Sequence, residues 1–272
     1  MHPIRFVVIG LNGYSLIHLE AIQWLAKQNL AHLSGVIALE TDRVKQPQLF
    51  KALKSQRVTF YENISTFLEK YADTANVLTV PLGIHQHVPV SVAAMQAGLD
   101  VYCEKPVAAT IQEVDHLIQT QQKTARKIVI GFQHIYSRSI KNLKARICDG
   151  RLGKVRSLRL IHGWPRSKRY YTRNDWAGRL RLGKLWVLDS PANNAMAHYL
   201  LNLLYLSSTH PGQTAVPINI RAELYRANLI EGADMTQIKC TTLENTQAWV
   251  IFTHCNSLNH LPFMQIECEN GR

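Results

Sequence analysis

Between Ile4 and about Gln133, short apolar segments alternate with longer segments of helical character, and this alternation most constrains the fold. The first segment, Ile4–Ile9, is apolar except at Arg5, as expected for a strand buried on both faces of a parallel sheet. Strands that alternate with helices build a parallel sheet covered by helices. The sequence therefore predicts an α/β fold, with a doubly wound parallel sheet over residues 1–133.

Beyond Gln133 the pattern changes. A helix of about a dozen residues is expected to end at Gly150, followed by a strand over Lys154–His162. A strongly apolar helix is expected over Asp189–Leu206. The rest reads as strands over Ile218–Ala227, Met235–Thr242, Ala248–His254 and Phe263–Glu269. We expect an α+β second domain over residues 134–272, with an open, mostly antiparallel sheet.

The composition excludes several classes of protein. The chain of 272 residues is 46% hydrophobic, as in soluble globular proteins, and no apolar run is long enough to span a bilayer. The N-terminus carries no signal-peptide pattern, so we expect a cytoplasmic protein without a membrane partner. The cysteines are scattered singly, so we expect neither a metal site nor a disulfide framework.

The net charge of +12 is spread along the chain, except for a denser region from Arg166 to Lys184. We find no recognition helix, zinc finger or RNP pattern, so we expect no nucleic-acid partner. We interpret the charge as that of a solvated surface, together with a site for an anionic cofactor or substrate.

A glycine-rich turn, Gly10-Leu11-Asn12-Gly13-Tyr14-Ser15, follows the first strand and precedes a helix that runs to about Gln28. Strand, turn and helix in this order are the context of a dinucleotide-binding fingerprint. The G-x-G-x-x-G frame reads Gly10, Asn12 and Ser15, so only its first glycine is kept. Asn12 tolerates the left-handed conformation better than most residues, and Ser15 is small.

Glu40 is expected at the end of a second strand over Gly35–Leu39. A carboxylate at this place accepts the ribose hydroxyls of an adenosine and repels a 2′-phosphate, which favours NAD over NADP. Asp42 is a competing candidate, and Arg43 weakens the preference. The alternative, that Glu40 only solvates a strand end, stays open.

A third candidate stretch begins with the strand Asp100–Cys103, which leads into Glu104-Lys105-Pro106. Ligands of open α/β sheets bind outside the carboxyl ends of the strands, where a lysine can donate a proton to a substrate oxygen. Pro106 restricts Lys105, and Thr110 with Glu113 has the spacing of a capping box for the next helix. A surface Lys-Pro turn is the alternative.

In the second domain, a polar loop combines rings that could stack on a sugar with polar groups that could hydrogen-bond to it. An exposed loop with incidental aromatic residues is the alternative. The candidate substrate residues of this loop are Tyr170, Tyr171, Asn174 and Trp176.

Together these motifs resemble the Gfo/Idh/MocA family of nicotinamide-dependent oxidoreductases, from about Ile4 to the C-terminus. The resemblance is carried by Cys103-Glu104-Lys105-Pro106 with Ala97-Gly98 before it, Pro81 with His85, Gly131-Phe132-Gln133, Gly150 with Leu152-Gly153-Lys154, and His18 three residues past Ser15.

The resemblance implies an N-terminal Rossmann domain, a C-terminal domain whose open sheet often mediates oligomers, and hence a homodimer or homotetramer. It implies NAD(H), or less favourably NADP(H), with a sugar, cyclitol or related polyol as substrate. Lys105 would be the catalytic lysine, and its bond to Pro106 is often cis in this family. The cofactor would contact Gly10, Asn12, Gly13 and Ser15 at the pyrophosphate, Glu40 at the ribose, and Pro81, His85, Glu104 and Gln133 elsewhere.

One departure concerns an Asp-x-x-x-His pair that family dehydrogenases commonly carry. The frame reads Asp189-Ser190-Pro191-Ala192-Asn193 here, so Asp189 is kept and asparagine replaces histidine. Asn193 can orient a hydroxyl but cannot take its proton. His198 is the nearest histidine, but on a continuous helix it would point about 140° away from Asn193. His162, at a strand end, is a further candidate for the histidine that takes the proton.

A second departure is that relatives usually continue beyond Arg272, so we expect a C-terminal domain that lacks its last part. The main hypothesis is an NAD(P)-dependent dehydrogenase or reductase acting on CH–OH groups. One alternative is a non-redox nucleotide-binding sensor or partner subunit, motivated by Asn193 and the short C-terminus. The other is an NAD-dependent glycosidase.

Overall fold

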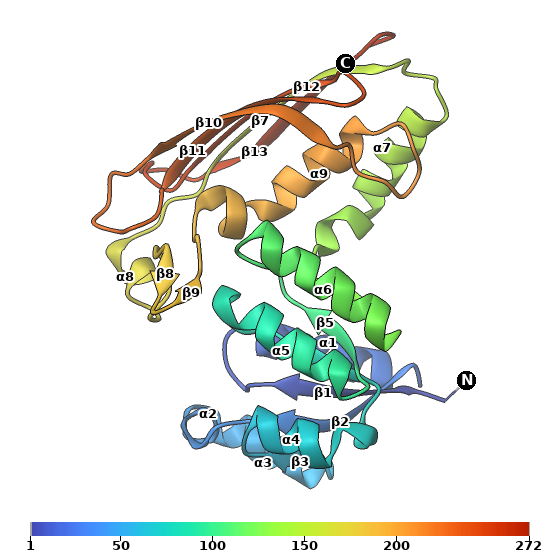
Figure 1. Ribbon diagram of the computed structural model, residues 1–272, viewed down its shortest axis with the longest axis vertical. Helices are drawn as coiled ribbons and strands as arrows, with labels where there is room; N and C mark the ends of the chain where they lie inside the picture. Colours follow the sequence, from blue (N-terminus) through green and yellow to red (C-terminus); the bar gives the residue numbers. More distant parts are fainter. Residues whose placement is uncertain (1, 272) are drawn as a thin grey trace. The chain divides into compact units, whose positions relative to one another are not determined.

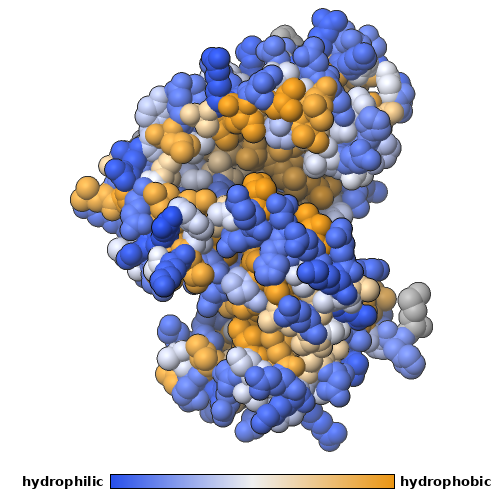
Figure 2. All heavy atoms as spheres, in the orientation of Figure 1, coloured by the Kyte–Doolittle hydropathy of each residue, from blue (hydrophilic) through white to orange (hydrophobic). Residues whose placement is uncertain are grey.

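The computed structural model describes residues 2–271 and divides the chain into two compact units, with the division after Gly131. The boundary expected at residue 133 lies two residues further along the chain. Each unit has its own sheet and its own core. Hydrophilic residues cover most of the visible surface of each unit, and smaller patches of hydrophobic residues lie among them (Figure 2).

The sheet of the N-terminal unit is parallel throughout, as the alternating pattern predicted. Its strand order is β3-β2-β1-β4-β5-β6, so the direction of winding reverses between β1 and β4. Ligands of doubly wound sheets bind beside such a reversal. The strands are β1 (Ile4–Ile9), β2 (Ala31–Ile37), β3 (Thr59–Tyr61), β4 (Val77–Val80), β5 (Asp100–Cys103) and β6 (Ile128–Ile130).

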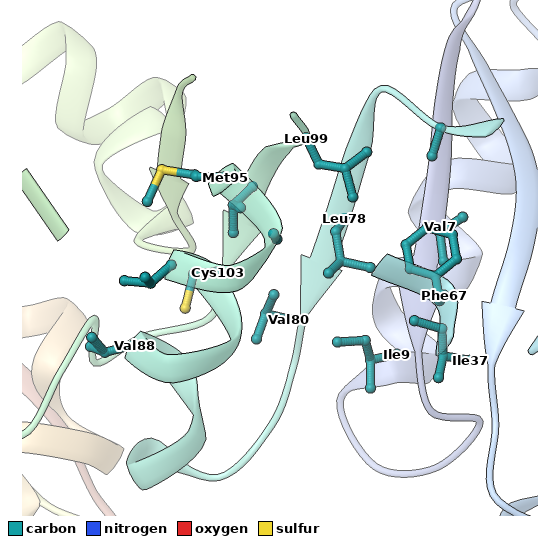
Figure 3. Close-up of a cluster of buried hydrophobic side chains, with 14 of the residues drawn as sticks. Val7, Ile9, Ile37, Phe67, Leu78, Val80, Val88, Met95, Leu99 and Cys103 are labelled. Atoms are coloured by element: carbon teal, nitrogen blue, oxygen red, sulfur yellow. The ribbon is translucent and has the colours of Figure 1, made fainter. Parts of the chain in front are cut away.

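Helices cover both faces of this sheet, and successive residues of β1 enter different cores. Val7 and Ile9 pack with residues of α4, α5 and α6, whereas Val8 packs with residues of α1 and α3. Figure 3 shows the first of these cores, with Leu78 and Val80 of β4 between Cys103 of β5 on one side and Val7 and Ile9 of β1 on the other. The helices are α1 (Ser15–Ala26), α2 (Glu40–Lys45), α3 (Pro47–Ser55), α4 (Ile64–Lys70), α5 (Ile84–Gln96) and α6 (Ile111–Thr124).

Two element boundaries in this unit differ from the sequence-based expectation. β2 ends at Ile37 because its partner β1 ends at the paired residue Ile9. Glu40 is therefore not at a strand end but begins α2. For the next helix the apolar run predicts a span of Val88–Ala97, but α5 begins at Ile84, because His85 and His87 are buried in its first turn although they look polar in the sequence.

In the C-terminal unit, five strands form one sheet in the order β10-β11-β12-β7-β13. Only the β12–β7 pair is parallel, so the expectation of a mostly antiparallel sheet is confirmed. The strands are β7 (Val155–Gly163), β10 (Pro217–Tyr225), β11 (Met235–Thr242), β12 (Gln247–Thr253) and β13 (His260–Cys268). The predicted polar loop holds α8 (Lys168–Tyr171) and a small hairpin of β8 (Arg181–Leu182) and β9 (Leu185–Trp186).

Two helices, α7 (Arg138–Cys148) and α9 (Ala197–Ser207), lie along one face of this sheet (Figure 1). Their buried residues pack against Leu158 and Leu160 of β7 and against Val250 and Phe252 of β12.

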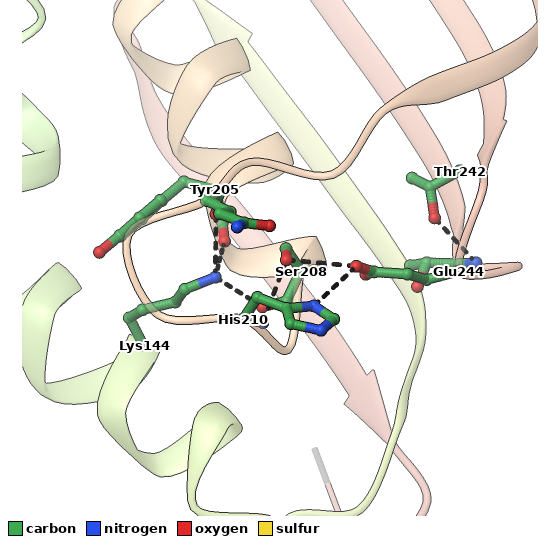
Figure 4. Close-up of polar contacts among 8 residues, drawn as sticks. Lys144, Tyr205, Ser208, His210, Thr242 and Glu244 are labelled. Carbon is green, nitrogen blue, oxygen red and sulfur yellow. Dashed lines mark hydrogen bonds and ion pairs between the residues drawn. The ribbon is translucent and has the colours of Figure 1, made fainter.

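A buried lysine joins the two helices of this unit. The Lys144 ammonium donates to the carbonyl oxygens of Tyr205 (2.6 Å), Ser208 (2.6 Å) and Gln213 (3.2 Å), as seen in part in Figure 4. The last carbonyls of a helix lack intrahelical donors, so this ammonium serves as a C-terminal cap for α9. Lys144 thereby fixes α7 against the end of α9.

The helix predicted over Asp189–Leu206 is interrupted. Residues Pro191–Ala195 form a π-helical turn, closed by the Met196 N–H on the Pro191 carbonyl at 2.8 Å, and α9 begins only at Ala197. Ser190 caps the turn, and Asp189 precedes it. Asn193 and His198 therefore lie on different helical segments, so the angle expected for one continuous helix does not apply to them.

Three further features concern the described residues alone. No helix within residues 2–271 is long and apolar enough to cross a membrane. In the same range, no three His, Cys, Asp or Glu side chains come together in a way that could hold a metal ion. The cysteines are free thiols, and Cys103 is buried in β5.

Candidate functional site

The turn after β1 depends on Gly10 and Ser15. Gly10 has a φ of +86°, and a Cβ atom at this residue would lie 2.8 Å from the Ser15 hydroxyl. Ser15 is buried and donates to the Ile9 carbonyl at 2.8 Å. A glycine is therefore required at residue 10, while Ser15 closes the turn at the position where the fingerprint has its last glycine.

Gly13 also has a positive φ, of +60°, and a Cβ atom there would meet no atom within 4 Å. The turn is thus open beside Gly13. α1 follows directly, and its first turn contains neither a side-chain cap nor an acidic residue. Backbone N–H groups at such a helix start favour an anion.

Asn12 does not adopt the left-handed conformation that its residue type would tolerate, and this correction has a physical reason. Its amide Nδ2 donates to the Asp42 carboxylate at 2.6 Å, which fixes the side chain toward the start of α2. Gly13 supplies the positive φ of the turn instead. Asn12 therefore ties the glycine-rich turn to the segment after β2.

Glu40 lies in the first turn of α2, three residues beyond the end of β2. Its side chain is 78% exposed and lies 3.6 Å from Arg43. Of the two acidic candidates, Asp42 is engaged by Asn12 and Glu40 faces solvent.

Glu104 is held in a buried contact directly before Lys105. Its carboxylate lies 3.1 Å from Nε2 of His18 and accepts from the Lys105 backbone N–H at 3.3 Å. The rings of Tyr102 and Tyr14 lie edge-on to His18. The Glu104 carboxylate thus links α1 to the segment that carries Lys105.

The contacts around Gly131 explain why a glycine follows β6. A Cβ atom at residue 131 would lie 2.7 Å from the Glu104 carboxylate oxygen, closer than such atoms approach one another. The glycine leaves room for this carboxylate, so the motif Gly131-Phe132-Gln133 has a packing reason in its first residue.

The sequence analysis missed His87, which joins two turns at the carboxyl edge of the sheet. Its ring nitrogens lie 2.6 Å from the Pro106 carbonyl oxygen and 3.0 Å from the Leu82 carbonyl oxygen. Burial lowers the pKa of His87, and a neutral imidazole donates to only one of these oxygens. The Lys105–Pro106 bond is cis, as the resemblance implied.

In the C-terminal unit, Asp189 is a buried carboxylate with an internal role. It accepts from the Gly178 backbone N–H at 2.7 Å and from the Asn194 side-chain amide at 2.9 Å. Asn193 donates from its side chain to the Leu188 carbonyl at 3.2 Å. Asp189 therefore fixes the loop around Gly178, and the sequence analysis did not foresee Asn194 as its partner.

His198 is packed in a cluster of rings near the start of this unit. It stacks on His134 at a centroid distance of 4.1 Å and lies edge-on to Phe132. Gln133 opens the 3-10 turn that carries His134. These are the contacts of a side chain packed among rings.

The candidate sugar loop uses much of its polar capacity internally. The Asn174 side-chain oxygen accepts from the backbone N–H groups of Trp176 and Ala177. Two guanidinium groups lie over the ring of Tyr170, those of Arg173 at 3.5 Å and of Arg166 at 4.4 Å. Burial raises the pKa of the Tyr171 phenol.

Two histidines lie where β7 and β12 end. His162 is buried, its ring is edge-on to Tyr199, and burial lowers its pKa. His254 is buried as well, and its Nδ1 donates to the Trp164 carbonyl at 2.7 Å. Burial lowers the pKa of His254 to about 4.

The low pKa of His254 predicts that acid destabilises this unit. The folded state favours the neutral ring, so this stability is present above about pH 6.5, the pKa of an unperturbed histidine, and is lost as the pH falls toward 4. We expect His254→Asn to reduce the loss of unfolding free energy between pH 7 and pH 4.5 by about 2–3 kcal/mol. Urea unfolding at the two pH values measures it, with the exposed His260→Asn as control. Equal losses in wild type and His254→Asn would contradict the assignment.

The strand order and the open, uncapped turn beside Gly13 define the N-terminal unit as a dinucleotide-binding domain of the Rossmann class. Residues 4–132 match the GFO_IDH_MocA family model, described as an oxidoreductase family with an NAD-binding Rossmann fold. The resemblance to the Gfo/Idh/MocA family drawn from the sequence is confirmed by this match, which covers residues 4–132.

Two curated relatives and one solved structure illustrate the similarity. The putative oxidoreductase YteT of Bacillus subtilis is 30% identical over 43% of this chain and 30% of its own length. An inositol 2-dehydrogenase of Corynebacterium glutamicum is 25% identical over 63% of this chain and 49% of its own. The chain thus spans less than half the length of these relatives.

The WlbA dehydrogenase of Bordetella pertussis, solved with NADH and UDP-GlcNAcA, shares the fold of this chain. The TM-score is 0.83 at 20% identity, over 98% of this chain and 77% of that structure.

Proposed function

We propose that this chain is an NAD-dependent oxidoreductase that moves a hydride between the nicotinamide and a carbinol carbon of a sugar, cyclitol or similar polyol. The observation that carries the proposal is the buried His18–Glu104 contact directly before Lys105. It fixes the end of β5 in the same sheet whose first strand leads into the open glycine-rich turn. A cofactor site and a proton donor at one edge of a sheet suit alcohol oxidation and carbonyl reduction.

The residues of the N-terminal unit fit a dinucleotide. A pyrophosphate would lie at Gly10, Asn12, Gly13 and Ser15, where the turn is open and α1 starts without a carboxylate. Glu40 would hold the adenosine ribose, because its carboxylate is exposed although Arg43 lies 3.6 Å away. Pro81, His85 and Glu104 would lie on the nicotinamide side, and Gln133 is the further cofactor residue that the resemblance implies.

When bound, NAD supplies the hydride acceptor. Lys105 transfers or holds the proton on the reacting oxygen, because its ammonium is a donor and its amine an acceptor. Asn193 orients a substrate hydroxyl. Asp189 positions the substrate indirectly, through the loop around Gly178 that its carboxylate holds. Tyr170, Tyr171, Asn174, Trp176 and His198 complete the proposed substrate side.

Glu40→Ala tests the ribose contact. Loss of a charged hydrogen bond to the ribose is expected to weaken NADH binding about tenfold and to leave NADPH binding unchanged or stronger. Calorimetry with both nucleotides measures it, and the exposed Glu69→Ala serves as control. No binding of either nucleotide to the wild type would overturn the proposed function.

Asn193 favours a second candidate, a nucleotide-binding sensor or partner subunit without redox chemistry, because asparagine cannot take a proton. Turnover of any polyol by the full chain eliminates it. An NAD-dependent glycosidase is the third candidate, and release of a reporter phenol from a glycoside without net NADH formation identifies it.

We also propose that the protein is cytoplasmic and forms a homodimer or homotetramer without nucleic-acid or membrane partners. Light scattering on the purified full chain gives the oligomeric state, and a monomeric mass would contradict this part of the proposal.

A further inference from the structure

Arg166 lies in a stack of rings and cations after β7. Its guanidinium carbon is 3.8 Å from the ring centroid of Trp164 and 4.4 Å from that of Tyr170. On the Tyr170 ring lies a second guanidinium, that of Arg173, which also lies 5.4 Å from Trp176. We call these five residues the arginine stack. Contact with aromatic rings holds a guanidinium in place without neutralising it.

The two guanidinium groups of the arginine stack have no acidic counterpart within the described residues. No Asp or Glu of residues 2–271 lies within 4.0 Å of Arg166 or Arg173, whereas Arg151 pairs with Asp149 and Arg179 with Glu231. Arg166 is partly buried, and its Nε is shielded from solvent without a hydrogen-bond partner in the same residues. A desolvated cation without an anion is costly, so the arrangement favours an anionic ligand.

The surroundings of Arg166 keep this positive charge uncompensated. Burial lowers the pKa of Arg166, and the neighbouring groups that act on it are Tyr170, Tyr171 and Arg173, none of which is a carboxylate. His254 has a pKa lowered to about 4 by burial, so it is neutral at pH 7. A nearby acidic group, Asp234, acts on His254 and Tyr171 but is not among the groups that act on Arg166.

Backbone contacts fix the segment that presents Arg166. The Arg166 N–H donates to the His254 carbonyl at 3.1 Å, and the His254 ring donates to the Trp164 carbonyl. The Arg173 guanidinium donates to the Tyr170 carbonyl at 2.6 Å. Because these contacts order both arginines without a ligand, little side-chain entropy remains to be lost on binding.

We propose that Arg166 and Arg173 bind the acidic group of the substrate, a carboxylate or phosphate carried by a sugar or polyol. Guanidinium groups donate two parallel hydrogen bonds to either anion, and rings beside them suit the apolar face of a sugar. This inference rests on the proposed function for the rest of the substrate, but the anion site itself stands on the arginine stack.

Calorimetry on the full chain tests it, with glucuronate, glucose 6-phosphate and uncharged glucose as probes at one ionic strength, with and without saturating NADH. At least one acidic probe is expected to bind more than tenfold tighter than glucose. Arg166→Gln is expected to remove this preference, and Arg173→Gln to reduce it. Arg169→Gln, an exposed arginine of the same loop, is expected to leave it unchanged. The tighter acidic probe identifies the group as carboxylate or phosphate.

The outcomes separate this inference from the proposed function. If NADH binds but neither acidic probe exceeds glucose, the anion site is overturned and the oxidoreductase stands. If an acidic probe is preferred and no nucleotide binds, the anion site stands and the oxidoreductase is overturned. A preference that survives in both Arg166→Gln and Arg173→Gln would overturn the anion site. Arg173 is exposed, so its variant remains informative if Arg166→Gln does not fold.

Discussion

Replacing Lys105 by methionine is expected to lower turnover by about 10³-fold, while NADH binding stays within about threefold of wild type. Methionine keeps most of the length of the side chain and removes its proton donor. The backbone contact of residue 105 with Glu104 does not depend on the side chain, so the cofactor edge of β5 is expected to persist. Steady-state kinetics with a polyol that the wild type oxidises, together with calorimetry, measures both quantities.

The exposed Lys123→Met on α6 is the matched control and is expected to behave as wild type. Turnover of Lys105→Met within tenfold of wild type would show that Lys105 does not handle the proton. A parallel loss of NADH binding would instead make Lys105 a binding residue.

Lys144→Met is expected to destabilise the C-terminal unit by about 3–5 kcal/mol, because three carbonyl oxygens, in one buried and two partly buried contacts, lose their donor together. Methionine fills nearly the same volume, so the effect isolates the hydrogen bonds rather than a cavity. For a unit of this size the loss corresponds to a fall in melting temperature of ~10 °C.

Thermal unfolding followed by circular dichroism measures this loss. Lys141→Met, on the exposed face one turn earlier on α7, is the control and is expected to change the melting temperature by about 2 °C or less. Equal melting temperatures of wild type and Lys144→Met would show that water replaces the ammonium without cost.

Features that depend on neighbours in the sequence could be predicted well. The capping box of α6 is present as expected, with the Thr110 side chain accepting from the Glu113 N–H and the Glu113 side chain accepting from the Thr110 N–H. The sequence pattern predicts a helix from about Ile111 to Thr124, and α6 spans Ile111–Thr124. Both bonds lie within four residues, so the sequence contains everything that they need.

Features that depend on distant residues were missed or misplaced. Glu40 was expected at a strand end, but β2 stops where its partner β1 stops, and that register is a property of the sheet. The helix after Asp189 is interrupted where the Pro191 carbonyl accepts from the Met196 N–H. The Asp189 carboxylate itself accepts from the Gly178 N–H. No local sequence pattern predicts such partners.

The sequence by itself determined the alternation that builds the parallel sheet, the glycine-rich turn, and the Glu104-Lys105-Pro106 motif that marks the family. Only the tertiary structure decided that His87 lies between two carbonyl oxygens and that Arg166 lies between rings with no carboxylate beside it. The reason is physical: periodicity and turn chemistry act over a few residues, whereas burial and charge pairing are set by segments that meet only after the chain has folded.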